Sequence, residues 1–223
     1  RSIWVTGVQT CALPISEGGR ILFEAFRHIA TRHGFRADFE SAHVARELFR
    51  GLVARTDIYA VVAEQDGHIT GSNFLWEGDA IAAIGPITVE PAAQDESTGR
   101  ELMRAVLERA DEQRFPGVRL VQAAYHNRSL ALYTKLGFDP REPLTAMHGR
   151  LAPTRIPGRH VRAATSLDLV ACDLLGARLL GFSRINEVCD AVRRDEAMVV
   201  EHAGRVTGDR KSTRLNSSHP YRS

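Results

Sequence analysis

The sequence is poor in cysteine and has no long apolar run. Its 223 residues include 3 cysteines, and no apolar stretch approaches the roughly 18 residues that suggest a transmembrane helix. A disulfide framework and a membrane span are therefore both excluded. Cys172 and Cys189 fall in segments expected to be helical, and two lone cysteines favour a reducing compartment. We therefore expect a cytoplasmic protein without a membrane partner.

Both ends of the chain can be encoded by one DNA sequence read in opposite directions. The stretch from Val5 to Ile15 can be encoded so that the reverse complement translates as Asp209 to His219, residue for residue. This relation resembles a sequencing adaptor translated at both ends of a DNA fragment. A signal peptide is the alternative at the N-terminus, but polar residues interrupt the apolar core that it needs. We expect residues 1–15 and 209–223 to be non-native tails outside the fold.

The tails hold the excess positive charge of the chain. The whole sequence has 29 Lys plus Arg and 27 Asp plus Glu, a formal net charge of +2. Without the tails the counts become 24 and 26, a net charge of −2. No basic patch survives this change, which excludes nucleic acid as the expected partner.

The first half of the chain predicts two helices followed by a β-hairpin. Apolar residues recur at helical spacing in residues 21–33 and 39–54. Residues 59–64 and 69–76 then predict two strands, which the turn Asp66-Gly67 joins as a hairpin.

A third strand is expected over residues 80–89, and it contains Gly85-Pro86. Proline has no amide hydrogen to donate, and glycine tolerates bulge geometry, so strand pairing should fail at this dipeptide. An edge strand tolerates the same pair and remains an alternative.

A polar segment from Gln94 to Arg100 leads into a long amphipathic helix that runs to about residue 113. Exposed amide hydrogens in a loop at a helix N-terminus form a binding site for phosphate groups. An ordinary capped helix is the alternative, because Thr98 and Glu101 have the spacing of a capping box.

A strand and a short helix follow. Residues 118–124 predict a strand parallel to the third one, because a strand–helix–strand order implies a right-handed crossover. The next helix should be capped by Asn127 and ended by Gly137. Its Tyr133 has a purely structural interpretation, as an aromatic residue half-buried against the strand. Residues 138–147 should supply the remaining antiparallel strands.

These segments together resemble one family. The loop Gln94 to Gly99 is similar to Gln/Arg-x-x-Gly-x-Gly/Ala, with Ser97 where glycine is usual. The run from His126 to Phe138, with Asn127 and Tyr133, is similar to the segment that follows in the same family. The chain thus resembles the acyl-CoA-binding core of the GNAT superfamily of N-acyltransferases. The resemblance implies an α/β fold, with a mixed, mostly antiparallel sheet, a splayed parallel pair and flanking helices.

The resemblance also implies acetyl-CoA as co-substrate, no metal, and a set of contact residues. In it, the backbone of the bulged strand bonds the pantetheine amides, and the loop before the long helix binds the pyrophosphate. Asn127 contacts the pantetheine arm, and Tyr133 protonates the departing thiolate as a general acid. The implied cofactor contacts are Ile87, Thr88, Val89, Gln94, Ser97, Thr98, Gly99, Arg100, Asn127 and Tyr133.

Two functions remain open from the sequence. The first is transfer of an acetyl group from acetyl-CoA to the primary amine of a small molecule or peptide. A base for that amine is not evident, because residues 80–89 contain no carboxylate, and the candidates are Glu77, Asp79, Glu90 and His126. The second is a non-catalytic module that binds acyl-CoA or only packs against a second unit of the same kind. Ser97 and the absence of an evident base suggest this alternative.

The second half of the chain repeats the first. Residues 161–165 predict a strand and Ser166 a helix cap; helices over 167–180 and 185–193 and a strand at 198–201 complete the pattern. Gly204 to Gly208 matches Gly67 to Gly71 at an offset of 137 residues. We expect a truncated second GNAT-like unit that packs against the first in the intact protein.

The repeat also suggests what the first unit has lost. Gly181-Phe182 matches Gly34-Phe35 at an offset of 147, which maps residues 161–164 onto residues 14–17. The opening strand of the first unit is therefore expected to be largely replaced, and the chain to be a fragment. The expected divisions are a tail (1–15), a GNAT domain (16–150), a linker (151–160), a truncated second domain (161–208) and a tail (209–223).

Overall fold

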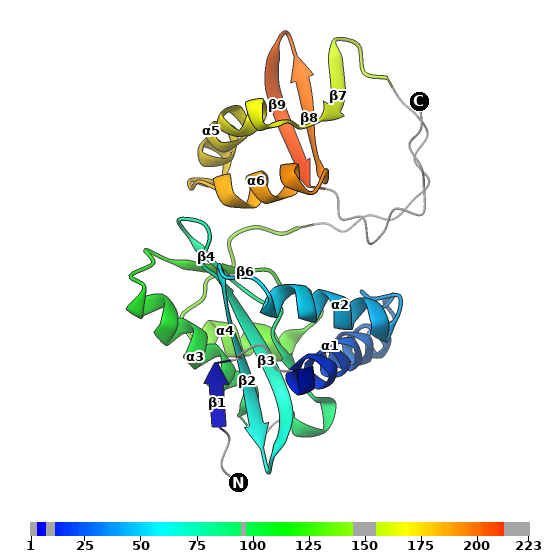
Figure 1. Ribbon diagram of the computed structural model, residues 1–223, viewed down its shortest axis with the longest axis vertical. Coiled ribbons are helices and arrows are strands. Elements are labelled where there is room, and N and C mark those ends of the chain that lie inside the picture. The colour runs from blue at the N-terminus through cyan, green and yellow to red at the C-terminus, as the bar shows by residue number, and fades with distance from the viewer. Residues whose placement is uncertain (1–3, 8–11, 95–96, 145–154, 212–223) are drawn as a thin grey trace. The chain divides into compact units, whose positions relative to one another are not determined.

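The computed structural model describes residues 4–7, 12–94, 97–144 and 155–211. The chain divides into two compact units, residues 1–142 and 143–223, and each is described by itself (Figure 1). In the described ranges, no helix has both the length and the apolar character needed to cross a membrane.

The first unit is built on a mixed sheet. Its strands follow the order β1-β2-β3-β4-β6, and β5 pairs with β3 off this path. β4 and β6 are parallel, whereas the other pairs are antiparallel. The expected α/β sheet with one parallel pair is therefore confirmed. The strands are β1 (Trp4–Gly7), β2 (Ile58–Gln65), β3 (His68–Trp76), β4 (Ala82–Ile84), β5 (Thr88–Val89) and β6 (Val118–Leu120).

Helices cover both sides of the β2–β3 hairpin. Figure 1 shows α3 on one side, and α1 with α2 on the other. Side chains of β2 alternate accordingly: Val61 and Ala63 join an apolar cluster with residues of α3, whereas Ala60 joins one with residues of α1 and α2. The helical segments are α1 (Ala12–Arg32), α2 (Ala42–Val53), η1 (Pro91–Ala93), α3 (Thr98–Glu112) and α4 (Asn127–Lys135).

α1 and α2 cross closely at two glycines. A Cβ on Gly18 would lie 2.2 Å from the ring of Phe49, and one on Gly19 would lie 2.7 Å from the Cα of Arg46. Any side chain at either position would push the helices apart. Glycine lowers helix propensity, but here it permits the contact that buries Phe49 completely.

The expectation that both tails lie outside the fold is wrong for their described parts. Residues 4–7 form β1, which pairs with β2, and α1 begins at Ala12. Residues 14–17, expected to correspond to a lost strand, are helical. Pro14 is compatible with this helix because it lies in the first turn, where a backbone amide hydrogen has no intrahelical acceptor to bond. Residues 209–211 belong to a strand of the second unit.

Other strands are shorter than predicted. The strand expected over residues 80–89 is divided into β4 and β5, because Gly85 adopts a φ of +122° and Pro86 has no amide hydrogen. The strand expected over 118–124 ends at Leu120. Residues 138–144 form no strand, and the remainder of the predicted segment, 145–147, lies outside the described residues.

The second unit pairs three antiparallel strands with two helices. The strands follow the order β7-β8-β9, and a small core forms around Cys172, Val188 and Val199. Thr165, rather than Ser166, caps the first helical turn, because the Asp168 carboxylate accepts bonds from its amide and its hydroxyl. The elements are β7 (Arg159–Ala163), η2 (Ser166–Asp168), α5 (Leu169–Leu180), α6 (Ile185–Arg193), β8 (Ala197–His202) and β9 (Arg205–Lys211).

The two units share element order and strand pairing. Each has a strand, two helices and a hairpin, with the first strand antiparallel to the first hairpin strand. Trp4 lies opposite Glu64, and His160 lies opposite Glu201. The register of each hairpin shifts at the same place, after Ala63 in one and after Val200 in the other.

Candidate acyl-CoA site

The parallel strands of the first unit diverge beyond their paired residues. Residues 82–84 of β4 pair with residues 118–120 of β6, after which Gly85-Pro86 leads the chain to β5. β5 pairs with β3 at Gly71 and Ser72, and no described strand pairs with the other edge of β5. That edge presents backbone groups to an extended ligand, as a missing strand would.

The three residues predicted to bond the pantetheine arm, at and just before β5, differ in the exposure of their side chains. Thr88 is 2% exposed, and its hydroxyl lies 2.8 Å from that of Ser72, so its side chain is used inside the protein. Ile87 and Val89 are half-buried. The polar groups that β5 offers to a ligand are thus those of the backbone.

The N-terminus of α3 follows β5 after the turn of η1. The amides of Arg100 and Glu101 donate to the carbonyl of Ser97, so the earlier amides of this helix have no partner within it. Ser97 is the N-cap and makes no side-chain capping bond, which corrects the expected capping box at Thr98. Thr98 is 1% exposed, and its hydroxyl has no hydrogen-bond partner in the described part of the chain.

Ser97 adopts a left-handed backbone conformation, with φ +69° and ψ −1°. Glycine adopts this conformation without strain, whereas a residue with a Cβ does so at a cost. The position where the family pattern has glycine is therefore one where the backbone favours glycine.

β5, the α3 N-terminus and α4 meet at Gly99. A Cβ built on Gly99 would lie 3.7 Å from Cγ2 of Val89 and 3.6 Å from Cδ2 of Leu132. Gln94 links the same segments, because its Nε2 donates to the carbonyl of Val89 at 3.4 Å and its Oε1 accepts from Arg128 at 3.3 Å. Three segments distant in sequence thus converge on one small region.

The start of α4 differs from the sequence expectation. His126 is the N-cap: its Nδ1 accepts a hydrogen bond from the amide of Ser129 at 3.2 Å and lies 3.0 Å from the Ser129 hydroxyl. Asn127, expected to be the cap, is the first helical residue and is exposed. The imidazole takes over the capping role because its unprotonated nitrogen is an acceptor. Gly137, at φ +90°, ends the helix as predicted.

Tyr133 is more deeply placed than a half-buried surface residue. It is 6% exposed and belongs to the core cluster that includes residues of β2, β4 and α3. Burial raises the pKa of Tyr133, and a hydrogen bond with the Ser129 side chain partly offsets this rise. A phenol with a raised pKa stays protonated at neutral pH and can donate a proton.

The four candidate bases have different surroundings. Glu77 accepts two hydrogen bonds from Arg109, and Glu90 accepts one from Arg20. In both residues an arginine thus engages the carboxylate that would have to accept a proton. Burial lowers the pKa of His126, which leaves its imidazole neutral at neutral pH. Asp79 is half-buried.

Sequence reasoning missed an aromatic pair beside the start of α4. The rings of Phe35 and Tyr125 are stacked, with centroids 4.4 Å apart and planes at 14°, and His33 lies 5.1 Å from Tyr125. Because these residues lie about 90 positions apart, no local spacing in the sequence indicates that they meet. In the described part of the chain, no group of three or more histidine, cysteine, aspartate or glutamate side chains is suited to hold a metal ion.

The sequence matches the acetyltransferase (GNAT) family over residues 20–138, and the chain therefore belongs to this family. Enzymes of the family use acetyl-CoA. The matched range contains β2 to β6, α2, α3, α4 and most of α1, and thus every segment of the candidate site.

Solved structures share the fold at low sequence identity. One is a PaiA N-acetyltransferase from Thermoplasma acidophilum in complex with coenzyme A, with 16% identity, a TM-score of 0.56, and coverage of 64% of this chain and 93% of that one. Another is a transcriptional regulator from Bacillus halodurans C-125, with 17% identity, a TM-score of 0.52, and coverage of 66% and 100%. No curated protein matches the chain.

Proposed function

We propose that the first unit is an N-acetyltransferase that moves an acetyl group directly from acetyl-CoA to a primary amine. The observation that carries this proposal is the convergence at Gly99, where side chains of β5 and α4 lie within 4 Å of the position that a Cβ on this first turn of α3 would take. These three segments supply the groups that the reaction needs: an open strand edge, helix amides without an intrahelical partner, and a protonated phenol.

The cofactor contacts follow from this arrangement. The backbone of Ile87, Thr88 and Val89 bonds the pantetheine arm along the open edge of β5. The amides at the start of α3 bind the pyrophosphate, and the unpaired Thr98 hydroxyl is a further donor beside them. The proposed contacts that complete this set are Gln94, Ser97, Gly99, Arg100 and Asn127.

In the proposed reaction, the amine nitrogen attacks the thioester carbonyl carbon, and the carbon–sulfur bond breaks. Tyr133 donates its proton to the departing thiolate. Backbone amides of β5 stabilise the negative charge that develops on the carbonyl oxygen. The proton of the amine passes to solvent water, because the acceptor nitrogen of His126 already caps α4.

Calorimetric titration of acetyl-CoA into the full chain tests the cofactor site. Gly99→Ala keeps ordinary van der Waals distances in the free protein, so it should fold normally and bind acetyl-CoA at least about tenfold more weakly. The matched control is Gly51→Ala, because Gly51 lies on α2 with open space around its Cα. Equal affinity in all three proteins would remove the α3 N-terminus from the site.

A second experiment tests the catalytic role of Tyr133. Tyr133→Phe should lower kcat by about 100-fold, because a general acid contributes at least this much, while the Kd for acetyl-CoA stays constant. Measurement of free thiol release over a panel of primary amines gives kcat. An unchanged kcat would exclude Tyr133 as the acid.

A non-catalytic acyl-CoA-binding module is the second candidate. The left-handed backbone at Ser97 favours it, because a Cβ at this place narrows the approach of a pyrophosphate. Saturable binding of acetyl-CoA without transfer to any amine would support a sensor. A folded chain that binds no acetyl-CoA would support a structural module.

We propose further that residues 159–211 are the first part of a second GNAT-like domain, so that the linker expected at 151–160 ends before β7 and the domain extends past the expected boundary at 208. The support is the shared element order, the shared register and the matching hairpin shift. The ends 1–15 and 209–223 remain proposed adaptor-derived tails on a fragment, and β1 then fills a position that a native strand takes in the parent protein. Sequencing the gene tests this: coding strands at the two ends that are not reverse complements would refute the adaptor origin.

A further inference from the structure

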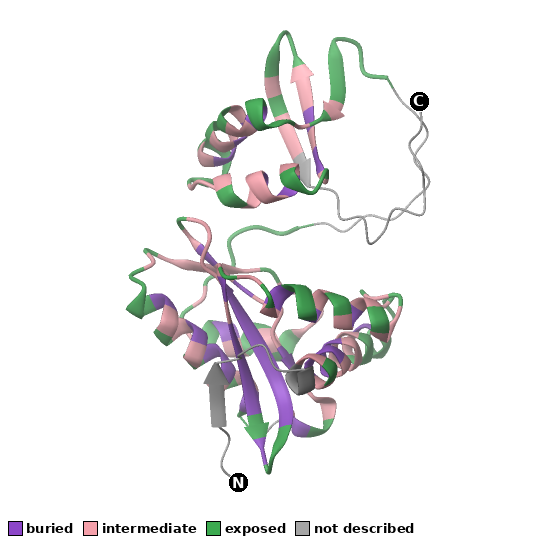
Figure 2. Ribbon diagram, in the orientation of Figure 1, coloured by how far each residue is buried: buried purple, intermediate pink, exposed green. Residues whose placement is uncertain are grey.

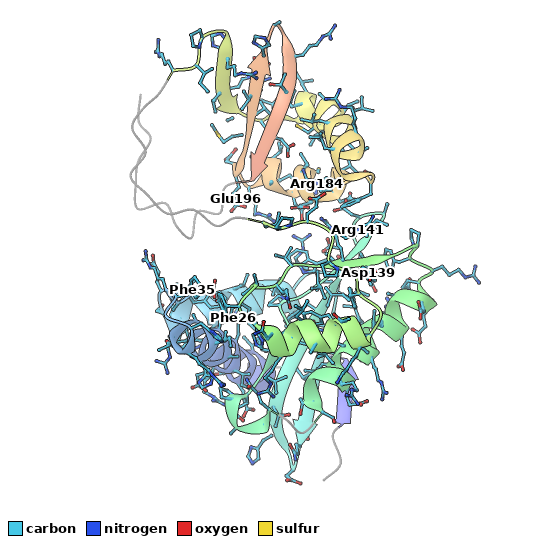
Figure 3. All side chains as sticks on the ribbon, turned by 180° about the vertical axis from the view of Figure 1, so that it is seen from behind. Phe26, Phe35, Asp139, Arg141, Arg184 and Glu196 are labelled. Carbon is cyan, nitrogen blue, oxygen red and sulfur yellow. The ribbon has the colours of Figure 1, made fainter. Side chains whose placement is uncertain are left out.

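The connection between α1 and α2 is held in place by aromatic contacts at both ends. The amide of Phe35 donates to the carbonyl of Ala30 at 2.9 Å. Farther along, the ring of Phe39 packs edge-on against Phe26, with centroids 5.4 Å apart and planes at 72°. Figure 3 labels Phe26 and Phe35 on this part of the molecule. The residues between them are therefore fixed relative to α1.

The same connection contacts the start of α4 through Tyr125. Phe35 stacks on the ring of Tyr125 and is still 56% exposed, so part of the pair faces solvent. Tyr125 immediately precedes His126 and Asn127, which belong to the proposed site. Since one residue spans at most about 3.6 Å of chain, the aromatic pair lies at the rim of that site.

Asp38 adds a negative charge beside this pair. No ion pair joins it to any other residue of the described ranges. Packing around the carboxyl raises the pKa of Asp38, because no cation offsets the loss of solvent. Burial, and next the charge of Asp38, raise the pKa of Tyr125.

An exposed aromatic face beside an uncompensated carboxylate attracts an organic ammonium group. The reacting amine must be neutral when it attacks, so a group held by Asp38 is not the reacting one. We propose that Phe35, Asp38 and Tyr125 form an acceptor subsite that binds a second, non-reacting ammonium group of a diamine. This inference rests on the proposed N-acetyltransferase function and names the class of its acceptor.

The probes are 1,4-diaminobutane and 1,4-butanediol, which have similar length, and only the first carries ammonium groups. Binding of each to the full chain is measured by ligand-observed NMR titration without acetyl-CoA. The variants are Asp38→Asn, Phe35→Leu and, as a control on the same connection, Glu40→Gln, because Glu40 is also exposed.

We expect the unmodified chain to bind the diamine about tenfold more tightly than the diol, as an ion pair with a cation–π contact allows. Asp38→Asn should abolish this preference, Phe35→Leu should reduce it, and Glu40→Gln should leave it unchanged. Absence of a preference in the unmodified chain, or an equal preference in Asp38→Asn, would overturn the proposal.

Measuring acetyl transfer as well as binding distinguishes a failure of this inference from a failure of the proposed function. Acetyl transfer to the diamine with no diamine preference in binding would keep the N-acetyltransferase function and refute the subsite. An Asp38-dependent binding preference without transfer to the diamine would keep the ammonium subsite and contradict the proposed acetyl transfer.

Discussion

The two hairpins of the protein, β2–β3 and β8–β9, have the same local structure. Their register shifts fall at positions 137 residues apart. In each, a threonine hydroxyl bonds a carbonyl of the partner strand: Thr70 to Ala63 at 3.4 Å, and Thr207 to Val200 at 3.2 Å. The turns also match, since Asp66-Gly67 and Ala203-Gly204 all have positive φ. The local sequence is sufficient to specify this unit twice.

The surroundings of the hairpins differ. Residues 69–75 of β3 are all buried, whereas the side chains of β9 described at 205–209 are exposed or half-buried (Figure 2). α3 covers the first hairpin with the buried side chains of Leu102, Met103 and Val106. In the second unit, Leu167 of η2 and Val170 and Leu174 of α5 are more than 60% exposed, and the described residues contain no counterpart of α3. A hairpin needs a second layer to bury both faces.

Polar contacts partly replace that layer in the second unit. Arg162 donates to both carboxylate oxygens of Asp168 at 2.7 Å and to Glu201 at 2.6 Å. These bonds join β7, η2 and β8 where the apolar core is small. The first unit thus depends on apolar burial, and the second depends to a larger extent on charged hydrogen bonds.

The largest expected effect comes from removing a buried apolar side chain from the first unit. Leu102→Ala should lower the free energy of unfolding of the first unit by about 3 kcal/mol, because it leaves a cavity at a fully buried position. Leu174→Ala, at a 67% exposed position, should change stability by less than about 0.5 kcal/mol. Denaturant unfolding of the full chain should show the transition of only one unit moving. Transitions that move together would mean that the units do not unfold independently.

A smaller effect is expected from the charged contacts of the second unit. The Arg162 guanidinium holds the pKa of Asp168 well below its usual range. Since the folded pKa is depressed, this stability is present above the unfolded pKa of about 3.9 and is lost as pH falls through the folded value. At neutral pH, Asp168→Asn should cost about 1.5 kcal/mol after allowance for solvent around Arg162.

Denaturant unfolding from pH 7 to pH 2 measures this dependence. Stability of the unmodified second unit should fall below about pH 4, and the difference from Asp168→Asn should shrink with it. The conservative control is Asp190→Asn, at a carboxylate on α6 whose pairs with Arg193 and Arg194 are long, 3.6 and 3.8 Å. A difference that stays constant across the range would show that Asp168 acts without its charge.

The predicted bounds of helices and strands agree best with the structure where a regular apolar pattern continues through the whole element. The helix at 185–193 has its predicted bounds, and β2, β3 and β8 begin and end within one residue of the predicted strands. β9 instead extends into the segment that was expected to be a tail. The strand expected over 80–89 was divided because Gly85 and Pro86 together end its pairing. β1 was missed because residues 4–7 were excluded on the basis of their coding DNA, which does not affect how the chain pairs.

The candidate site was predictable only where one local segment defines it. The loop before α3 and the helix with Tyr133 were located from their motifs, and their ligand roles remain proposals. The cap at His126 was missed because asparagine is the more frequent cap, although imidazole nitrogen is an equivalent acceptor. The Phe35–Tyr125 stack depends on tertiary packing between α1 and α4, and no sequence period records such a contact.

The smallest predicted effect concerns the half of the first unit that has no described counterpart in the second. Ser97→Gly should stabilise the first unit by about 0.5–1 kcal/mol, because it removes a Cβ from a left-handed residue at the cost of some unfolded-state entropy. Ser97→Ala is the control, since it removes the hydroxyl and keeps the Cβ. If Ser97→Gly also tightens acetyl-CoA binding whereas Ser97→Ala does not, the Cβ limits cofactor approach. Equal affinities in the three proteins would mean that Ser97 fits the cofactor as it stands, and would leave the non-catalytic alternative without its main support.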